Sequence, residues 1–192
     1  MEFILILVAY LLGSIPTGYV LGSLAGVDVR KAGSGNVGAT NVARVVGKRH
    51  GLLTLIGDTA KGLIPVLLAG QLNSTTEVIA LVAVAAFLGH LYPVFLKFHG
   101  GKGVATALGV LLGLAPLATV VLIAIFVLIV VTSRLVSLSS MIAAALAPLA
   151  LWWFSYPPVL VGASALLAVM IILRHRGNIQ RLLAGTEPKF GS

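Results

Sequence analysis

Long apolar runs separated by short polar segments dominate this sequence of 192 residues. Most of the runs are close to the roughly 20 residues that an α-helix needs to cross the hydrocarbon of a bilayer. The pattern therefore predicts an all-α, polytopic membrane protein. The runs cover about residues 2–26, 51–72, 77–96, 104–131, 138–154 and 156–173.

The polar segments between the runs differ in charge, and this difference predicts the orientation of the helices. Segment 27–50 carries five Lys or Arg residues against one Asp, and segment 97–103 and the tail from residue 174 are also basic. Segment 73–77 contains neither Lys nor Arg. Because basic connections stay in the cytoplasm, we expect the N-terminus and segment 73–77 outside, and the three basic segments inside.

The basic tail can lie inside only if an even number of helices lies between residues 103 and 173. Counting 104–131 as one helix gives three, whereas a break at Leu114-Ala115-Pro116 gives four, and proline is a common helix breaker. We therefore predict about seven transmembrane helices, the fourth short or broken, with the N-terminus outside and the C-terminus in the cytoplasm. Residues 1–192 are expected to form a single integral membrane domain.

Composition excludes a water-soluble protein and several kinds of site. Only 9% of the residues are charged and 59% are hydrophobic, whereas soluble domains carry roughly 25% charged residues. The net charge of +8 would suggest nucleic-acid binding in a soluble protein, but here the basic residues flank apolar runs, so we expect anionic headgroups or substrates instead. The chain has no cysteine, and its His and acidic residues are too scattered to predict a metal site.

The first polar constellation is the run from Ser34 to Arg44. Its glycines free the backbone to present successive N–H groups to an anion, and Arg44 offers a planar fork that matches phosphate oxygens. The alternative is a turn-rich loop that precedes a helix starting near Thr40. Further candidate phosphate contacts in this run are Asn36, Gly38, Thr40 and Asn41.

The second constellation, His99 to Thr106, opens an apolar run. Glycines before a helix let a phosphate meet free N–H groups at the positive end of the helix dipole, and Lys102 would add a point charge. The spacing differs from that of a nucleotide P-loop. The alternative is a flexible loop with one lysine that only sets orientation. The residues singled out are Gly100, Gly101, Lys102, Gly103 and Thr106.

The third constellation follows the last apolar run, from Arg174 to Glu187. It predicts a short amphipathic interfacial helix that ends at Gly185. His175 and Asn178 are three residues apart and so share a helix face. The arginines are expected to be a basic flank of the last span.

A few polar residues lie near or inside the apolar runs. Asp58 and Lys61 are three apart, which predicts a structural ion pair, although charges in membrane helices are functional candidates. His90 ends the third run and is expected to be a satisfied interfacial histidine. The predicted topology also places Ser139 and Ser140 on the cytoplasmic side.

These three motifs, in this order and over nearly the whole chain, closely resemble the bacterial acyl-phosphate:glycerol-3-phosphate acyltransferase (PlsY) family. The resemblance implies transfer of a fatty acyl group from acyl phosphate to the 1-hydroxyl of sn-glycerol 3-phosphate. The products would be lysophosphatidic acid and inorganic phosphate, in phospholipid biosynthesis. It also implies a monomer without cofactor or metal in the cell (inner) membrane, with its active site at the cytoplasmic face and no nucleic-acid partner.

The resemblance implies a role for each matching residue. The expected catalytic residues are Ser34, Arg44, Lys102, His175 and Asn178. The expected phosphate- or substrate-binding residues are Asn36, Gly38, Thr40, Asn41, Gly100, Gly101, Gly103 and Thr106, and His90 and Glu187 are expected to support the site. Ser139 or Ser140, which the predicted topology places on the same side, is expected to add a further contact.

The identity of the base stays open at this point. His175 could accept the hydroxyl proton, but it lies between Arg174 and Arg176, so we hypothesise that acyl-phosphate oxygens accept it instead. Two other functions compete with acyl transfer. A transporter of phosphorylated solutes predicts polar groups at the membrane midplane and an internal repeat, and a phosphotransferase predicts acidic metal ligands; neither pattern is present.

Overall fold

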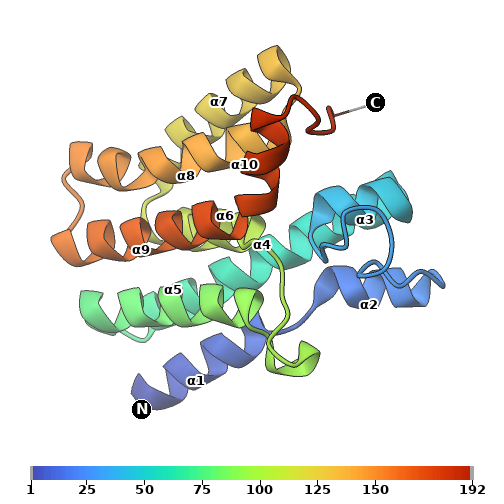
Figure 1. Ribbon diagram of the computed structural model, residues 1–192. Coiled ribbons are helices and arrows are strands. Elements are labelled where there is room, and N and C mark those ends of the chain that lie inside the picture. Colours follow the sequence, from blue (N-terminus) through green and yellow to red (C-terminus); the bar gives the residue numbers. More distant parts are fainter. Residues whose placement is uncertain (1, 191–192) are drawn as a thin grey trace. The chain divides into compact units, whose positions relative to one another are not determined.

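The computed structural model describes residues 2–190, and all regular structure in this range is helical: ten α-helices and one short 3-10 helix. This confirms the predicted all-α class. The chain divides into two compact units, Met1–Gly113 and Leu114–Ser192, whose helices are labelled in Figure 1.

The first unit contains the helices up to residue 113. The run predicted over 2–26 is broken by Pro16, whose ring cannot donate the hydrogen bond that a continuous helix needs. The long second helix begins at Lys48, directly after Gly47 with φ +129°. The helices are α1 (Glu2–Gly13), α2 (Thr17–Leu24), α3 (Ala39–Val45), α4 (Lys48–Gln71), α5 (Thr76–Leu91), η1 (Val94–Leu96) and α6 (Val104–Leu114), whose last residue passes the boundary between the units.

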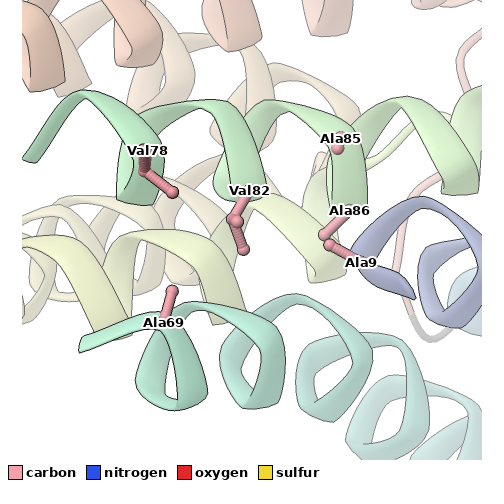
Figure 2. Close-up of a cluster of buried hydrophobic side chains, with 6 residues drawn as sticks. All are labelled: Ala9, Ala69, Val78, Val82, Ala85 and Ala86. Carbon is pink, nitrogen blue, oxygen red and sulfur yellow. The ribbon is translucent and has the colours of Figure 1, made fainter. Parts of the chain in front are cut away.

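Small side chains allow α1, α4 and α5 to pack closely around a buried apolar cluster (Figure 2). A Cβ atom on Gly13 would collide with the main chain of Ala86, and one on Gly89 would collide with the main chain of Tyr10. Close backbone approach through small residues is how helices associate when lipid surrounds them. The cluster consists of Ala9, Ala69, Val78, Val82, Ala85 and Ala86.

The second unit packs three apolar helices in chain order, α7 on α8 and α8 on α9. They are α7 (Pro116–Ser133), α8 (Val136–Trp153) and α9 (Pro158–Arg174), and the short α10 (Arg176–Leu183) follows α9 at an angle of 58°. Helix α10 ends at Leu183, two residues before Gly185, which has φ +68°, a left-handed conformation common after helix ends. The predicted tail helix is therefore confirmed.

The predicted break near residue 115 is confirmed as well. Helix α6 ends at Leu114 and α7 begins at Pro116, the first helical position that proline favours. With 11 residues, α6 is only about 16 Å long, as expected of a short fourth helix.

Five helical segments between residues 2 and 190 are long and apolar enough to span a bilayer, or six if α9 and α10 form one bent span. Leu24, Phe3 and Trp153 each expose more than three quarters of their surface, which suits side chains that face lipid. The seven-helix count and the orientation remain predictions.

Candidate functional site

Asn41 organises the loop that carries the first motif. Its side chain is 2% exposed, and its Nδ2 donates to the carbonyl oxygens of Val29, Ala32 and Asn36 at 2.8–3.1 Å. Its Oδ1 accepts a hydrogen bond from the N–H of Ser34 at 2.8 Å. These contacts occupy the amide group, so we revise the expected role of Asn41 from binding a phosphate to ordering the loop around Ser34.

The same loop depends on glycines with positive φ. Gly33 has φ +60° and Gly35 has φ +71°, a conformation that side chains other than hydrogen disfavour. Asn36 Oδ1 accepts a hydrogen bond from the N–H of Gly38 at 2.7 Å, directly before α3. The loop therefore has a defined shape, and the Asn36 side chain contributes to it through its oxygen.

Three polar side chains of this motif point away from the packed interior. Ser34 and Thr40 are exposed, and Arg44 is exposed in the last turn of α3. Beneath them lies a buried apolar cluster that fastens the loop and α3 to the unit; it comprises Val29, Val37, Val42 and Leu96. The arrangement presents two hydroxyls and one guanidinium on a rigid base, as an anion-binding surface requires.

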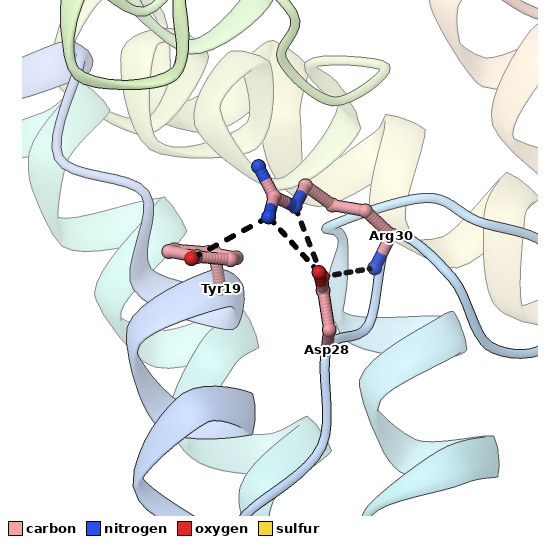
Figure 3. A network of polar contacts seen from close by, with 3 residues as sticks. All are labelled: Tyr19, Asp28 and Arg30. Atoms are coloured by element: carbon pink, nitrogen blue, oxygen red, sulfur yellow. Dashed lines mark hydrogen bonds and ion pairs between the residues drawn. The ribbon is translucent and has the colours of Figure 1, made fainter.

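Beside this loop, the first basic side chain of segment 27–50 is already paired (Figure 3). Arg30 forms an ion pair with Asp28 at 2.9 Å and stacks over the ring of Tyr19, 4.3 Å from its centroid. The hydrogen bond from Arg30 lowers the pKa of the Asp28 carboxyl to about 2. Asp28 thus stays ionised, and Arg30 is engaged with it.

The second motif forms a turn between η1 and α6. The N–H groups of Gly100 and Gly101 donate to the carbonyl oxygens of Leu91 and His90 at 3.1 and 3.2 Å. The expectation that these two N–H groups face a phosphate is therefore wrong, because they satisfy the C-terminal carbonyls of α5. The unbonded N–H groups that every helix start presents begin after Lys102, where α6 starts at Val104.

Gly103 lies at the point where this turn enters α6. Its φ is +86°, and a Cβ atom there would collide with the ring of Phe87. Only glycine fits this position, because any larger residue would both strain the backbone and collide with Phe87.

Thr106 lies in the first turn of α6, where α6 crosses α4. A Cβ atom on Gly62 would collide with the carbonyl oxygen of Thr106, and one on Gly109 with that of Thr59. Thr106 is fully buried, and its hydroxyl has no hydrogen-bond partner within residues 2–190. The structure therefore places its side chain inside the packed unit, at the base of the motif.

In the second unit, His175 sits at the junction of α9 and α10 and is 3% exposed. Its Nδ1 lies 2.8 Å from the carbonyl oxygen of Ile171. Because a carbonyl oxygen can only accept, we assign the proton of neutral His175 to Nδ1. Nε2 is then the nitrogen that can accept a proton or, when protonated, donate a hydrogen bond.

Glu187 joins three side chains of the second unit. Ser137 Oγ and Asn178 Nδ2 each donate to Glu187 Oε1 at 2.6 Å, and Arg181 Nε donates to Oε2 at 2.7 Å. Burial raises the pKa of the Glu187 carboxyl, but these three hydrogen bonds outweigh burial and lower it overall. Glu187 is therefore an ionised anchor for Asn178, consistent with the supporting role expected of it.

Ser139 and Ser140 are buried in the first turn of α8. Their hydroxyls donate to the carbonyl oxygens of Leu135 and Val136, four residues earlier, at 2.9 and 2.8 Å. Each hydroxyl has used its only proton in this way and keeps the capacity to accept.

The structure gathers the predicted residues in three places. The Ser34–Arg44 group shares one loop and α3, the Gly100–Thr106 group shares the start of α6, and Asn178 joins Glu187. The predicted topology places Ser137 and Arg134 on the cytoplasmic side, but the sequence did not indicate their partners. Ser137 bonds to Glu187 across 50 positions, and the Arg134 side chain donates to the Phe190 oxygen at 3.1 Å. The one available signal was that Glu187 is the lone acidic residue of a basic tail.

Comparisons with known proteins cover almost the whole chain. A sequence model described as glycerol-3-phosphate acyltransferase matches residues 3–185. The glycerol-3-phosphate acyltransferase of Trichlorobacter lovleyi is 56% identical over 182 residues, which are 95% of this chain and 94% of that protein. The protein of the same name from Geobacter sulfurreducens is 53% identical over 189 residues, 98% of this chain and 97% of its own.

Solved structures agree with these relatives. The crystal structure of PlsY, an integral membrane glycerol 3-phosphate acyltransferase, in its glycerol 3-phosphate form matches with a TM-score of 0.96 at 44% identity, over 99% of this chain and 96% of that one. Its lysophosphatidic acid form matches with a TM-score of 0.93, over 99% and 95% of the two chains. This chain therefore belongs to the glycerol-3-phosphate acyltransferase family of integral membrane proteins.

Proposed function

We propose that the protein transfers a fatty acyl group from acyl phosphate to the 1-hydroxyl of sn-glycerol 3-phosphate, releasing lysophosphatidic acid and inorganic phosphate. We place this reaction at the cytoplasmic face of the cell (inner) membrane and assign it to a monomer. The observation that carries the proposal is the ordered loop that exposes Ser34, Thr40 and Arg44. Family membership supplies the acceptor; the donor is our inference.

The balance of charges supports a substrate with phosphate groups. The chain has 13 Lys or Arg residues and only 5 acidic ones. Three of the acidic residues, Asp28, Asp58 and Glu187, already form ion pairs with Arg30, Lys61 and Arg181. An exposed cation such as Arg44 is thus left for an anion that the substrate brings.

Acyl phosphate is a donor that needs no covalent nucleophile from the protein. The chain has no cysteine, and a mixed anhydride is already activated, so direct attack by the glycerol hydroxyl needs no covalent enzyme intermediate. In this scheme the hydroxyl oxygen bonds to the acyl carbon, the bond from that carbon to the phosphate oxygen breaks, and phosphate leaves. Positioning and charge stabilisation would provide most of the rate.

We assign the roles as follows. Arg44 and Lys102 neutralise phosphate, and Gly103 gives the glycerol-phosphate loop its shape. Ser34 and Asn178 donate hydrogen bonds to substrate oxygens. The hydroxyl proton passes to an acyl-phosphate oxygen, while His175 chiefly binds and orients through Nε2.

Purified protein with acyl phosphate and glycerol 3-phosphate tests the reaction through the release of inorganic phosphate. We expect release that needs both substrates and is unchanged by a metal chelator. Parallel reactions with acyl-CoA in place of acyl phosphate should give no lysophosphatidic acid. Activity only with acyl-CoA, or loss of activity with the chelator, would overturn the proposed donor and mechanism.

A further inference from the structure

A polar cluster inside the first unit has no part in the mechanism proposed above. Asp58 and Lys61 lie one turn apart in α4, with Asp58 Oδ1 and Lys61 Nζ 2.8 Å apart. They are 1% and 8% exposed, in a helix that is apolar enough to span the membrane. A lone charge in such a helix is strongly disfavoured, so the two charges depend on each other.

Lys61 connects this pair to the break between α1 and α2. Its Nζ donates to the carbonyl oxygen of Ile15 at 2.7 Å. Ile15 lies between the end of α1 at Gly13 and the start of α2 at Thr17. Lys61 thereby holds the start of α2, which leads into the loop that carries Ser34.

His90 connects the same pair to the second phosphate motif. Its Nδ1 lies 3.8 Å from Asp58 Oδ1, and its other ring nitrogen, Nε2, packs so closely on Gly101 that a Cβ atom there would collide with it. The carbonyl oxygen of His90 also accepts the hydrogen bond from the N–H of Gly101. The position of Gly101, and of Lys102 after it, therefore follows the position of the His90 ring.

A small cavity completes the cluster. Its volume is about 10 Å³, and Asp58, Lys61 and His90 line it together with Ser14 and Thr17. Neither carboxylate oxygen of Asp58 accepts a hydrogen bond of good geometry from the described residues. This volume equals the minimum that one water molecule needs, and a polar separation longer than 3.5 Å, such as the 3.8 Å between His90 and Asp58, is where a bridging water is to be sought.

We propose that Asp58, Lys61 and His90, joined by one ordered water, form a positioning unit for the glycerol 3-phosphate loop. The ion pair anchors the His90 ring, and the ring sets the place of Gly101 and Lys102 against the phosphate. This inference rests on the proposed function in one respect, the assignment of residues 99–103 to glycerol 3-phosphate. The three residues are positioning residues, because none of them is expected to touch substrate.

Steady-state kinetics of His90 variants separate positioning from mere stability. His90→Leu should raise KM for glycerol 3-phosphate about 10-fold or more while kcat and KM for the acyl donor change less than about 3-fold, because a displaced loop weakens binding. His90→Gln, which keeps a hydrogen-bonding group, should recover most of this loss. If His90 only stabilised the fold, His90→Leu would lower the fraction of protein that is folded and active but leave KM unchanged. That result would overturn the proposal. His50→Leu, in the first turn of α4, is the matched control.

A double variant tests the ion pair without leaving a single charge in the helix. Asp58→Asn with Lys61→Met keeps the segment neutral, and Glu77→Gln at the exposed start of α5 controls for the loss of a carboxylate. We expect weaker binding of glycerol 3-phosphate alone, measured by calorimetry on folded protein, for the double variant and not for the control. Wild-type affinity in the double variant would contradict the proposal.

The two proposals fail in different ways. If wild-type protein acylates glycerol 3-phosphate from a donor other than acyl phosphate, the proposed donor is wrong, but KM and Kd for glycerol 3-phosphate still decide the role of His90. If the wild-type reaction is as proposed and the variants keep wild-type KM and Kd, only the positioning unit is wrong.

Discussion

His175 shows how a single hydrogen bond limits the chemistry available to a residue. Its Nδ1 is engaged with the carbonyl oxygen of Ile171, so Nε2 alone can exchange a proton or contact substrate. Arg174 and Arg176 flank His175 in the sequence, and their positive charges disfavour a positive charge on the ring. The hydrogen bond leaves Nε2 able to accept a proton, so it is the charge of the two arginines that favours a role in binding and orientation over one as general base.

The variant His175→Gln tests this assignment, because glutamine keeps a hydrogen-bonding group but cannot act as a base. If acyl-phosphate oxygens accept the proton, kcat at saturating substrates should fall by less than about 100-fold. A general base contributes roughly 10²–10⁴-fold, so a loss at the upper end of that range would identify His175 as the base. His50→Gln, outside the proposed site, should retain wild-type kcat.

Glu187 links residue chemistry to the stability of the tail. Its folded-state pKa is lowered, so the ionised carboxylate stabilises the fold above its ordinary pKa of 4.5, and this contribution is lost as the pH falls through the lowered value. We expect the melting temperature of the wild type to drop through this range, and the drop to be smaller for Glu187→Gln.

At neutral pH, Glu187→Gln should melt about 3 °C or more below the wild type, because the amide cannot satisfy Arg181 and Asn178 together. Glu77→Gln is the carboxylate control and should melt like the wild type. Identical pH profiles for Glu187→Gln and wild type would contradict the assignment of an ionised anchor.

At the scale of the helices, close crossings between small residues position the phosphate motif. The start of α6 is held against α4 because Gly62 and Gly109 leave no space for a Cβ atom between the two backbones. Such contacts are specific, because an added methyl group must push one helix away from the other.

Gly109→Ala should therefore destabilise the first unit. Overpacking of this kind costs about 1–3 kcal/mol, and the shift of α6 should also reduce acyl transfer. Gly162→Ala in α9 is the matched control, because its Cβ atom would meet nothing within 4 Å and alanine favours a helix. Equal melting temperatures for the two variants would contradict this prediction, because they would show that the α4–α6 crossing accommodates the added methyl group.

Several helix ends could be predicted from the sequence because they depend on local chemistry, although the break at Pro16 inside the run 2–26 was not. Pro116 marked the break between α6 and α7, and Gly185 marked the end of α10. The contacts that shape the site are not local. The hydrogen bond from Lys61 to Ile15 spans 46 positions, and that from Ser137 to Glu187 spans 50. No periodicity encodes such pairs, so only the three-dimensional structure gives them.

At the scale of the whole molecule, the distribution of charge predicts the topology. Seven helices put segment 27–50 and the tail on the cytoplasmic side and the α8–α9 turn outside. A count of six, without α6 as a span, would move the tail to the outside. The two counts therefore differ in the side on which His175 and Asn178 lie, and hence in whether a cytoplasmic substrate can meet them.

The absence of cysteine makes this topology measurable with single introduced cysteines and a membrane-impermeant maleimide. Ser74→Cys and Ser155→Cys should react in intact cells, whereas Lys31→Cys and Gln180→Cys should react only after permeabilisation. The wild-type chain gives the background because it has no thiol to label. Labelling of Gln180→Cys in intact cells would put the tail outside, which would exclude the seven-helix topology and a cytoplasmic site that includes His175 and Asn178.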